Sequence, residues 1–279
     1  MSAPESLSAP GASLAIYRDG PSLDGARTAA IGQFACETAA AGAALIHEVI
    51  AQLRAEGFGA VLGPMDGSTW ARHRLVVESD GRPSFLMEPS NPEHYVDAFE
   101  QSGLKVVARY VSAVRPSSAS VSASPPLVGL RLRNFDVDKA EEELSRIHAI
   151  SLESFASNLF YQPISREDFL ASYRPVLRVI EPELVLMAED GSGALRAFLF
   201  ALPNLAEGPK PDAVILKTYA SRVKGGGSML ANAFHERAKR HGFSEVIHAL
   251  MHESNLSATH SGNAGGKVFR RYALWGGRL

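Results

Sequence analysis

Hydrophobic residues recur with helical spacing after Ser228. The apolar positions Leu230, Ala233, Phe234 and Ala238 form one stripe. The charged residues Glu236, Arg237, Lys239 and Arg240 are expected to face water. Gly242 follows this stripe and predicts the left-handed residue at which a helix ends. The pattern therefore predicts an amphipathic helix with one buried face.

Other parts of the second half predict a hairpin, further strands and two more helices. Gly191 and Gly193 separate two apolar runs and predict a hairpin. A helix is expected over 138–151, and a second begins at Ser165, where Asp168 resembles the end of a capping box. The segment SATHSGNAGG is rich in glycine and is expected to form helix poorly. The predicted strands are 127–135, ELVLMAED, ALRAFLFALP, AVILKTYAS, EVIHALMHE and KVFRRYALWGGRL.

The chain contains a sequence repeat. The stretch GAALIHEVIAQLRAEGFGAV matches GSMLANAFHERAKRHGFSEV, with Gly42 and Gly57 opposite Gly227 and Gly242. Further on, GLKVVARYVSA resembles GGKVFRRYALW, with Tyr110 opposite Tyr272. Two amphipathic units can look alike by chance, but two matches in the same order favour duplication.

Composition narrows the class of protein. The 279 residues carry a net charge of −2, which does not indicate a nucleic-acid surface or a polybasic membrane patch. Cys36 is the single cysteine, so no intrachain disulfide forms, and its apolar neighbours predict a buried, inert thiol. Without a signal-peptide pattern or a run of ~20 apolar residues, we expect a cytoplasmic protein without membrane contact.

A segment rich in Ser, Ala and Pro, RPSSASVSASPP, divides the chain. The expected organisation is a first domain over 1–116, a linker over 117–129 and a second domain over 130–279. Each half contains one copy of the repeat.

The most informative stretch is SRVKGGGSM, which lies between a predicted strand and the predicted helix. The first amides of a helix lack partners and its dipole attracts anions, so a glycine-rich entry suits a diphosphate. Arg222 and Lys224 would add positive charge. A glycine-rich turn with solvated basic neighbours is the plainer alternative. The first copy has Glu37 and alanines at this place, so only the second copy is expected to bind an anion well.

The run Arg222-Val223-Lys224-Gly225-Gly226-Gly227 matches Q/R-x-x-G-x-G/A, the acyl-CoA signature of the GNAT superfamily of N-acyltransferases. The resemblance covers about residues 130–279. It implies an α/β fold with a mixed, mostly antiparallel sheet flanked by helices. The first half resembles a partial, degenerate copy of this fold that starts at its fourth strand.

The resemblance also implies a function. The protein would move an acetyl or other acyl group from CoA to a small-molecule or peptide amine by direct attack, without a metal and without nucleic acid. A homodimer is left open. The implied cofactor-binding residues are Thr218, Tyr219, Ala220, Arg222, Val223, Lys224, Gly225, Gly226, Gly227, Ser228 and Asn255.

The catalytic groups are less clear, because SATHSGNAGG lacks the tyrosine that many members use to protonate the thiolate. The candidates are Tyr272, His252 and Glu253, each of which has a structural role as its alternative. One alternative function is a catalytically inactive acyl-CoA-binding or regulatory protein. Another is an enzyme that binds a small anion or a nucleotide at the same helix start.

No metal is expected. His235-Glu236 lacks the second histidine of H-E-x-x-H, because Lys239 occupies that position. His248 and His252 lie four residues apart on one strand, about 13 Å, which is too far to share an ion.

Overall fold

The computed structural model describes residues 3–120 and 127–279, which form two compact units. The first unit comprises Met1–Val111, Asn158–Gln162 and Arg270–Leu279, and the second comprises Ser112–Ser157 and Pro163–Phe269. The units differ from the two expected domains in three segments. Residues 112–116 belong to the second unit, whereas residues 158–162 and 270–279 belong to the first. Residues 121–126 of the predicted linker lie outside the described residues.

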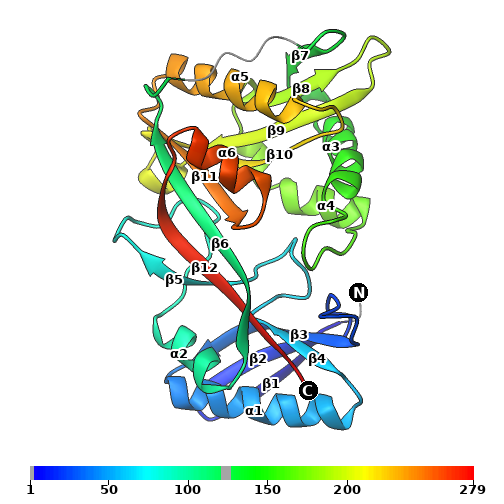
Figure 1. Cartoon of the computed structure of the whole chain (residues 1–279), viewed down its shortest axis with the longest axis vertical. Coiled ribbons are helices and arrows are strands. Elements are labelled where there is room, and N and C mark those ends of the chain that lie inside the picture. The colour runs from blue at the N-terminus through cyan, green and yellow to red at the C-terminus, as the bar shows by residue number, and fades with distance from the viewer. Residues whose placement is uncertain (1–2, 121–126) are drawn as a thin grey trace. The chain divides into compact units, whose positions relative to one another are not determined.

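The first unit is a sheet with two helices (Figure 1). Its strands follow the order β1-β2-β3-β4-β12-β6, and β5 also pairs with β12. The strand β3 is antiparallel to β2 and parallel to β4. The elements are β1 (Glu5–Ala9), β2 (Ala12–Tyr17), β3 (Thr28–Cys36), α1 (Ala39–Ala55), β4 (Ala60–Gly63), β5 (Leu75–Ser79), α2 (His94–Gln101), the start of β6 (Lys105–Pro116) and most of β12 (Lys267–Arg278).

The second unit is a sheet in the order β6-β11-β10-β9-β8-β7. Only β10 and β11 are parallel among the pairs β7–β8, β8–β9, β9–β10 and β10–β11. Its elements are β7 (Arg131–Asn134), α3 (Ala140–Ser154), α4 (Arg166–Tyr173), β8 (Val185–Glu189), β9 (Leu195–Pro203), β10 (Ala213–Ser221), α5 (Gly226–Arg240), β11 (Glu245–His252), α6 (Leu256–Asn263) and four 3-10 turns, Val137–Lys139, Val176–Arg178, Pro182–Leu184 and Leu205–Glu207.

The mixed, mostly antiparallel sheet flanked by helices confirms the predicted fold class. Each predicted strand of the second half is present, and Ser165 caps α4 by accepting the amide of Asp168 at 3.1 Å. One prediction was wrong, since SATHSGNAGG does form a helix, α6. It ends at Asn263, Gly265 follows with a φ of +82°, and Ser261 ties the helix to β11. Glycines at the end of the segment therefore cap the helix.

The repeat is present in the structure with the register found in the sequence. Ala29 pairs with Val61 in the first copy, and Val214 pairs with Val246 in the second. Corresponding strand residues are therefore 185 positions apart. Gly42 and Gly227, at the start of the two helices, are separated by the same number. The first copy does not start at its fourth strand, because β1-β2-β3 match β8-β9-β10. The hairpin β1–β2 escaped detection because ESLSA, one of its strands, is polar and largely exposed.

The two copies exchange their last strands. The strand β12 ends the second copy but pairs with β4 of the first, with Trp275 opposite Gly63. The strand β6 ends the first copy but lies beside β11 of the second. Each compact unit is therefore completed by a strand from the other copy, which explains why Arg270–Leu279 belong to the first unit.

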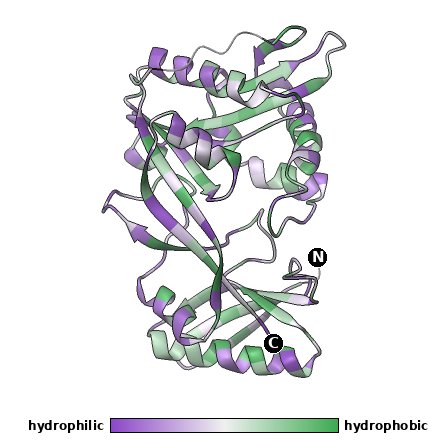
Figure 2. Cartoon of the chain, viewed as in Figure 1, coloured by the Kyte–Doolittle hydropathy of each residue, from purple (hydrophilic) through white to green (hydrophobic). Residues whose placement is uncertain are grey.

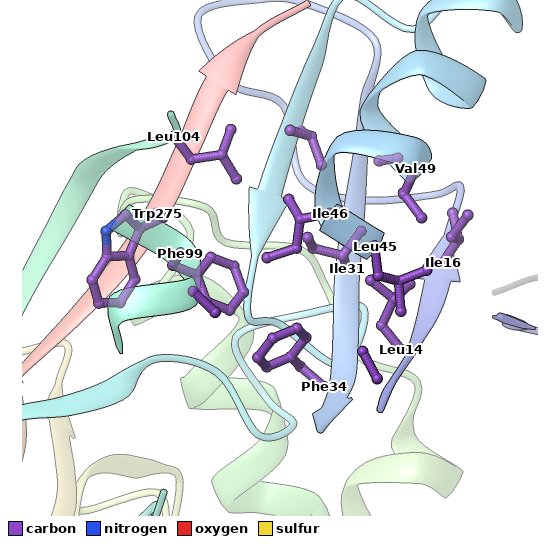
Figure 3. Packing of buried hydrophobic residues seen from close by; sticks show 14 of the residues in the cluster. Leu14, Ile16, Ile31, Phe34, Leu45, Ile46, Val49, Phe99, Leu104 and Trp275 are labelled. Atoms are coloured by element: carbon purple, nitrogen blue, oxygen red, sulfur yellow. The ribbon is translucent and has the colours of Figure 1, made fainter. Parts of the chain in front are cut away.

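The core of the first unit lies between α1, α2 and the sheet (Figure 3). Leu45, Ile46 and Val49 of α1 are almost fully buried against it. Trp275 of β12 is 1% exposed, and its ring centroid lies 5.5 Å from that of Phe99. Burying such large side chains stabilises the unit by about 1.5–3 kcal/mol each.

The second unit has its own core. Strands β8 and β9 are mostly hydrophobic, whereas α5 carries hydrophilic stretches (Figure 2). The apolar side of α5, with Leu230, Phe234 and Ala238, is fully buried against this sheet. The predicted stripe of α5 is thereby confirmed. Of the helices described in residues 3–120 and 127–279, none combines the length and hydropathy of a bilayer span.

A pair of buried histidines joins α5 to β11. The ring centroids of His235 and His248 lie 5.2 Å apart, and His248 Nδ1 lies 2.6 Å from Ser261 Oγ of α6. Burial lowers the pKa of His235 to about 3 and that of His248 to about 4, and the cation of Arg115 adds to both shifts. Both rings are therefore neutral near pH 7.

Replacing Trp275 by alanine is expected to lower the free energy of unfolding by about 3–5 kcal/mol, because a large cavity remains. Urea unfolding followed by far-UV circular dichroism measures this loss. Val268→Ala on the same strand is the control, because Val268 is 47% exposed. Equal losses in both variants would contradict the placement of Trp275 in a core.

The histidine pair predicts an acid-sensitive fold. Unfolded histidine titrates near pH 6.5, so the unfolded chain binds more protons, and stability is complete above pH ~6.5 and falls toward pH 4. Each histidine contributes a slope of up to about 1.4 kcal/mol per pH unit. His248→Gln should reduce this slope in urea titrations between pH 7 and 4.5, whereas the exposed His260→Gln should not. An unchanged slope in His248→Gln would oppose this account.

Candidate functional site

The loop that joins β10 to α5 carries main-chain donors without protein acceptors. Gly225 precedes the helix with a φ of +83°, a left-handed conformation that glycine adopts without strain, and no side chain caps the helix. The amide of Gly226 donates to Val223 O at 3.0 Å, and that of Val223 donates to Ser221 Oγ at 3.0 Å. Among the described residues, no acceptor takes the four amides of Lys224, Gly225, Gly227 and Ser228.

Tight packing explains why glycine follows Gly225. A Cβ at Gly226 would collide with Oγ of Ser221, and a Cβ at Gly227 would lie 3.1 Å from the ring of Tyr219. The hydroxyl of Ser221 also donates to Val223 O at 2.8 Å. Ser221 thus fixes the conformation of the loop through two hydrogen bonds to Val223. Its position at the end of β10, directly before the signature, is the sequence feature that could have indicated this role.

The two basic residues of the loop differ. Arg222 Nε lies 2.7 Å from Glu153 Oε2, and the same guanidinium donates to Ala149 O at 3.1 Å. Arg222 therefore anchors the loop to α3, a contact that the sequence pattern did not indicate. Lys224 is exposed, and within the described chain its ammonium has no ion-pair partner. Lys224 supplies the available positive charge at the loop.

Beside the loop, the parallel strands β10 and β11 separate. Their pairing runs from Ala213–Glu245 to Leu216–His248 and then ends, although β10 continues to Ser221. Lys217 is the extra residue of a bulge against β9, since Leu216 and Thr218 pair with consecutive β9 residues. Bulges increase local twist and redirect a strand. Over Thr218–Ser221, the edge of β10 that faces away from β9 thus has no paired strand in the described structure.

The residues predicted on β10 lie along this edge. Thr218 and Tyr219 are half-buried and Ala220 is buried, and all three pair with β9 on their other side. Burial raises the pKa of Tyr219, so its hydroxyl is a neutral donor at pH 7. The structure brings these residues together with the glycine loop in one unit.

The strand β11 is bent away at Leu250. This residue has a φ of +56°, which is unusual for leucine, and its amide donates to Ser112 Oγ of β6 at 3.0 Å. Ser112 is fully buried. No sequence pattern indicated Ser112, because its importance arises from the exchanged strand.

The predicted residues His252, Glu253 and Asn255 follow this bend. His252 ends β11, and its Nδ1 lies 2.8 Å from Ser254 Oγ. Glu253 is exposed in the turn, and Asn255 stands at the start of α6 without a side-chain cap bond. All three belong to the second unit, as the loop does. Within the described chain, no group of three or more His, Cys, Asp or Glu residues could hold a metal.

Tyr272 belongs to the other compact unit. It is fully buried in the first unit, where its hydroxyl donates to Glu88 Oε1. Glu88 also pairs with Arg270 at 2.6 Å, and burial raises the pKa of the Glu88 carboxyl. The structure does not bring Tyr272 into the unit that carries the loop, and its hydroxyl serves a buried polar cluster.

The corresponding places in the first copy carry protein hydrogen bonds that the second copy lacks. Thr38 caps α1 by accepting the amide of Ala41 at 3.2 Å. Beside β3, the amide of Met65 donates to Ile31 O at 2.7 Å, and Asp66 Oδ1 accepts the amide of Gln33 at 2.6 Å. A side chain thus caps the helix mouth of the first copy, and Met65 and Asp66 bond to the edge of its strand. Cys36, at the end of β3, is buried as predicted, and burial raises the pKa of its thiol.

Comparison with known proteins identifies the fold. No protein-family model and no curated protein matches the chain. Among solved structures, it is similar to a GCN5-related N-acetyltransferase from Sphaerobacter thermophilus, with a TM-score of 0.55, 14% identity and 96% of this chain and 76% of that chain covered.

Two further structures agree. A tandem GNAT protein from the clavulanic acid biosynthesis pathway gives a TM-score of 0.54 at 14% identity, covering 96% of this chain and 79% of that one. A probable N-acyltransferase from Enterococcus faecalis gives 0.58 at 10%, covering 95% and 58%. Together with the internal repeat, these matches show that the chain has the tandem GNAT fold.

Proposed function

We propose that the second copy binds an acyl-CoA and transfers its acyl group to an amine. The observation that carries this proposal is the mouth of α5, where four main-chain amides lack acceptors among the described residues. The fold supports acyl transfer in general terms. The proposed cofactor, its binding residues and the catalytic groups are argued from this chain's own residues.

The diphosphate of CoA fits the loop Val223–Ser228. Its oxygens would accept the amides of Lys224, Gly225, Gly227 and Ser228, and the helix dipole adds favourable charge. The ammonium of Lys224 would attract the same anion, whereas Arg222 would hold the loop against α3. Asn255 is a further candidate contact, at the start of α6.

The pantetheine arm fits the edge of β10. Its two amide groups resemble a short peptide, and an extended peptide binds an exposed strand edge through main-chain hydrogen bonds. The edge over Thr218–Ala220 runs directly into the diphosphate loop. An arm bound there would place the thioester between β10 and the diverging end of β11.

The chemistry requires no covalent enzyme intermediate. A neutral amine attacks the thioester carbonyl, a C–N bond forms, the C–S bond breaks, the amine loses a proton and the thiolate gains one. Main-chain amides of the open edge can polarise the carbonyl. His252 and Glu253, at the end of β11, are the candidates for moving these protons. Tyr272 is not retained, because its hydroxyl is committed to Glu88.

The acceptor is proposed to be a small-molecule or peptide amine, and acetyl is the proposed acyl group. A homodimer and a cytoplasmic location stay predictions from the sequence. The shape of the acceptor site depends on loops that the fold does not specify.

Isothermal titration should show that the protein binds acetyl-CoA and that Gly226→Glu weakens binding about 100-fold or more. The new Cβ would collide with Ser221, and the new carboxylate would repel the diphosphate. Gly191→Glu adds the same charge in the β8–β9 turn, where a Cβ meets no atom within 4 Å, and should bind normally. Absent binding in the wild type, or competition by ATP but not by CoA, would contradict the proposal.

A turnover assay distinguishes an acyltransferase from a protein that only binds acyl-CoA. Thiol release from acetyl-CoA should rise when a panel of primary amines is added, and it should fall in His252→Ala or Glu253→Gln with binding retained. Tyr272→Phe, which keeps the buried ring, should leave turnover near the wild-type rate. Tight binding without turnover across a broad panel would instead favour an acyl-CoA-binding or regulatory protein.

A further inference from the structure

The amide of Leu250 has a counterpart in the first copy that bonds differently. With the constant difference of 185 positions, Met65 corresponds to Leu250 and Ile31 corresponds to Leu216. In the first copy the amide of Met65 donates to Ile31 O and closes the gap between the parallel strands. In the second copy the amide of Leu250 donates to Ser112 Oγ. The same main-chain amide therefore bonds to the neighbouring parallel strand in the first copy and to β6 in the second copy.

The bond to β6 has an energetic reason. A leucine with a φ of +56° is strained, and such a conformation persists only when its surroundings fix it. The hydroxyl of Ser112 is a buried acceptor 3.0 Å from that amide, so bending toward it gains a hydrogen bond in a dry environment. The strand pairing of β10 and β11 ends two residues earlier, at Leu216–His248.

We propose that Ser112 is a positioning residue of the acyl-CoA site, which holds β11 away from β10 by accepting the amide of Leu250. The inference rests on the proposed function of the second copy. Ser112 lies on β6, the last strand of the first copy, so the degenerate copy contributes a residue that keeps the site of the other copy open. Strand exchange thereby gives the first copy a role in acyl-CoA binding.

The test compares two ligands in three variants. Ser112→Ala removes the acceptor, Ser112→Thr retains a hydroxyl, and Ser151→Ala is the matched control, because Ser151 is equally buried and donates to Ile147 O within α3. The ligands are CoA and its nucleotide half, 3′-phospho-ADP, which lacks the pantetheine arm. Titration calorimetry gives the Kd of each pair, and thermal unfolding reports the loss of stability.

Ser112→Ala should raise the Kd for CoA about tenfold, the worth of one buried hydrogen bond, while the Kd for 3′-phospho-ADP stays unchanged. Ser112→Thr should restore CoA binding, and Ser151→Ala should change neither Kd. If Ser112 served stability alone, Ser112→Ala would weaken the binding of both ligands equally or of neither. An equal Kd for CoA in Ser112→Ala and wild type would overturn this inference and leave the proposed function intact, whereas a wild type that binds neither ligand would remove both.

Hydrogen exchange keeps the proposal testable if Ser112→Ala does not fold. In the wild type without ligand, the Leu250 amide should exchange slowly, because it donates to a buried hydroxyl. Fast exchange at Leu250 in a folded wild-type protein would overturn the proposal without any variant.

Discussion

The structure depends on where unpaired main-chain groups find partners. A parallel strand pair that separates leaves N–H and C=O groups that must bond to chain, water or ligand. In the second copy, β10 and β11 separate after Leu216, and the loop and first turn of the adjacent helix carry four amides that no described acceptor takes. Strand edge and helix mouth are continuous along the chain. A ligand with a diphosphate and peptide-like groups would satisfy both at once.

The duplicated copies show how this capacity is lost. The first copy keeps the strand order, the helix and the register, so its architecture is that of a binding unit. Thr38 caps its helix, and Met65 and Asp66 bond to the edge of β3. These bonds use main-chain groups of the first copy that correspond to groups bonded differently in the second copy. What the copy provides instead is β6, which completes the second unit's sheet.

Much of the fold follows from local sequence. Alternating apolar residues, the Ser165 cap and the Gly242 terminus specify strands and helices of the second half, because these signals act within a few residues. The polar β1 and the glycine-terminated α6 were missed, since tertiary contacts decide them. The exchange of β6 and β12 was not foreseen either, because pairing between distant strands leaves no local pattern. Ser112 acts across such a pairing, and Glu153 reaches Arg222 from α3, so neither contact has a local pattern. Tyr272 belongs to the first unit because β12 pairs with strands of the first copy.

The account is tested most directly by amide hydrogen exchange with and without saturating CoA, read segment by segment. It predicts strong new protection over residues 218–228, where strand edge and helix mouth are open, and no change over residues 31–43, where Thr38 caps the helix and Met65 and Asp66 bond to the strand edge. New protection at residues 31–43, or none at residues 218–228 although CoA is bound, would contradict it.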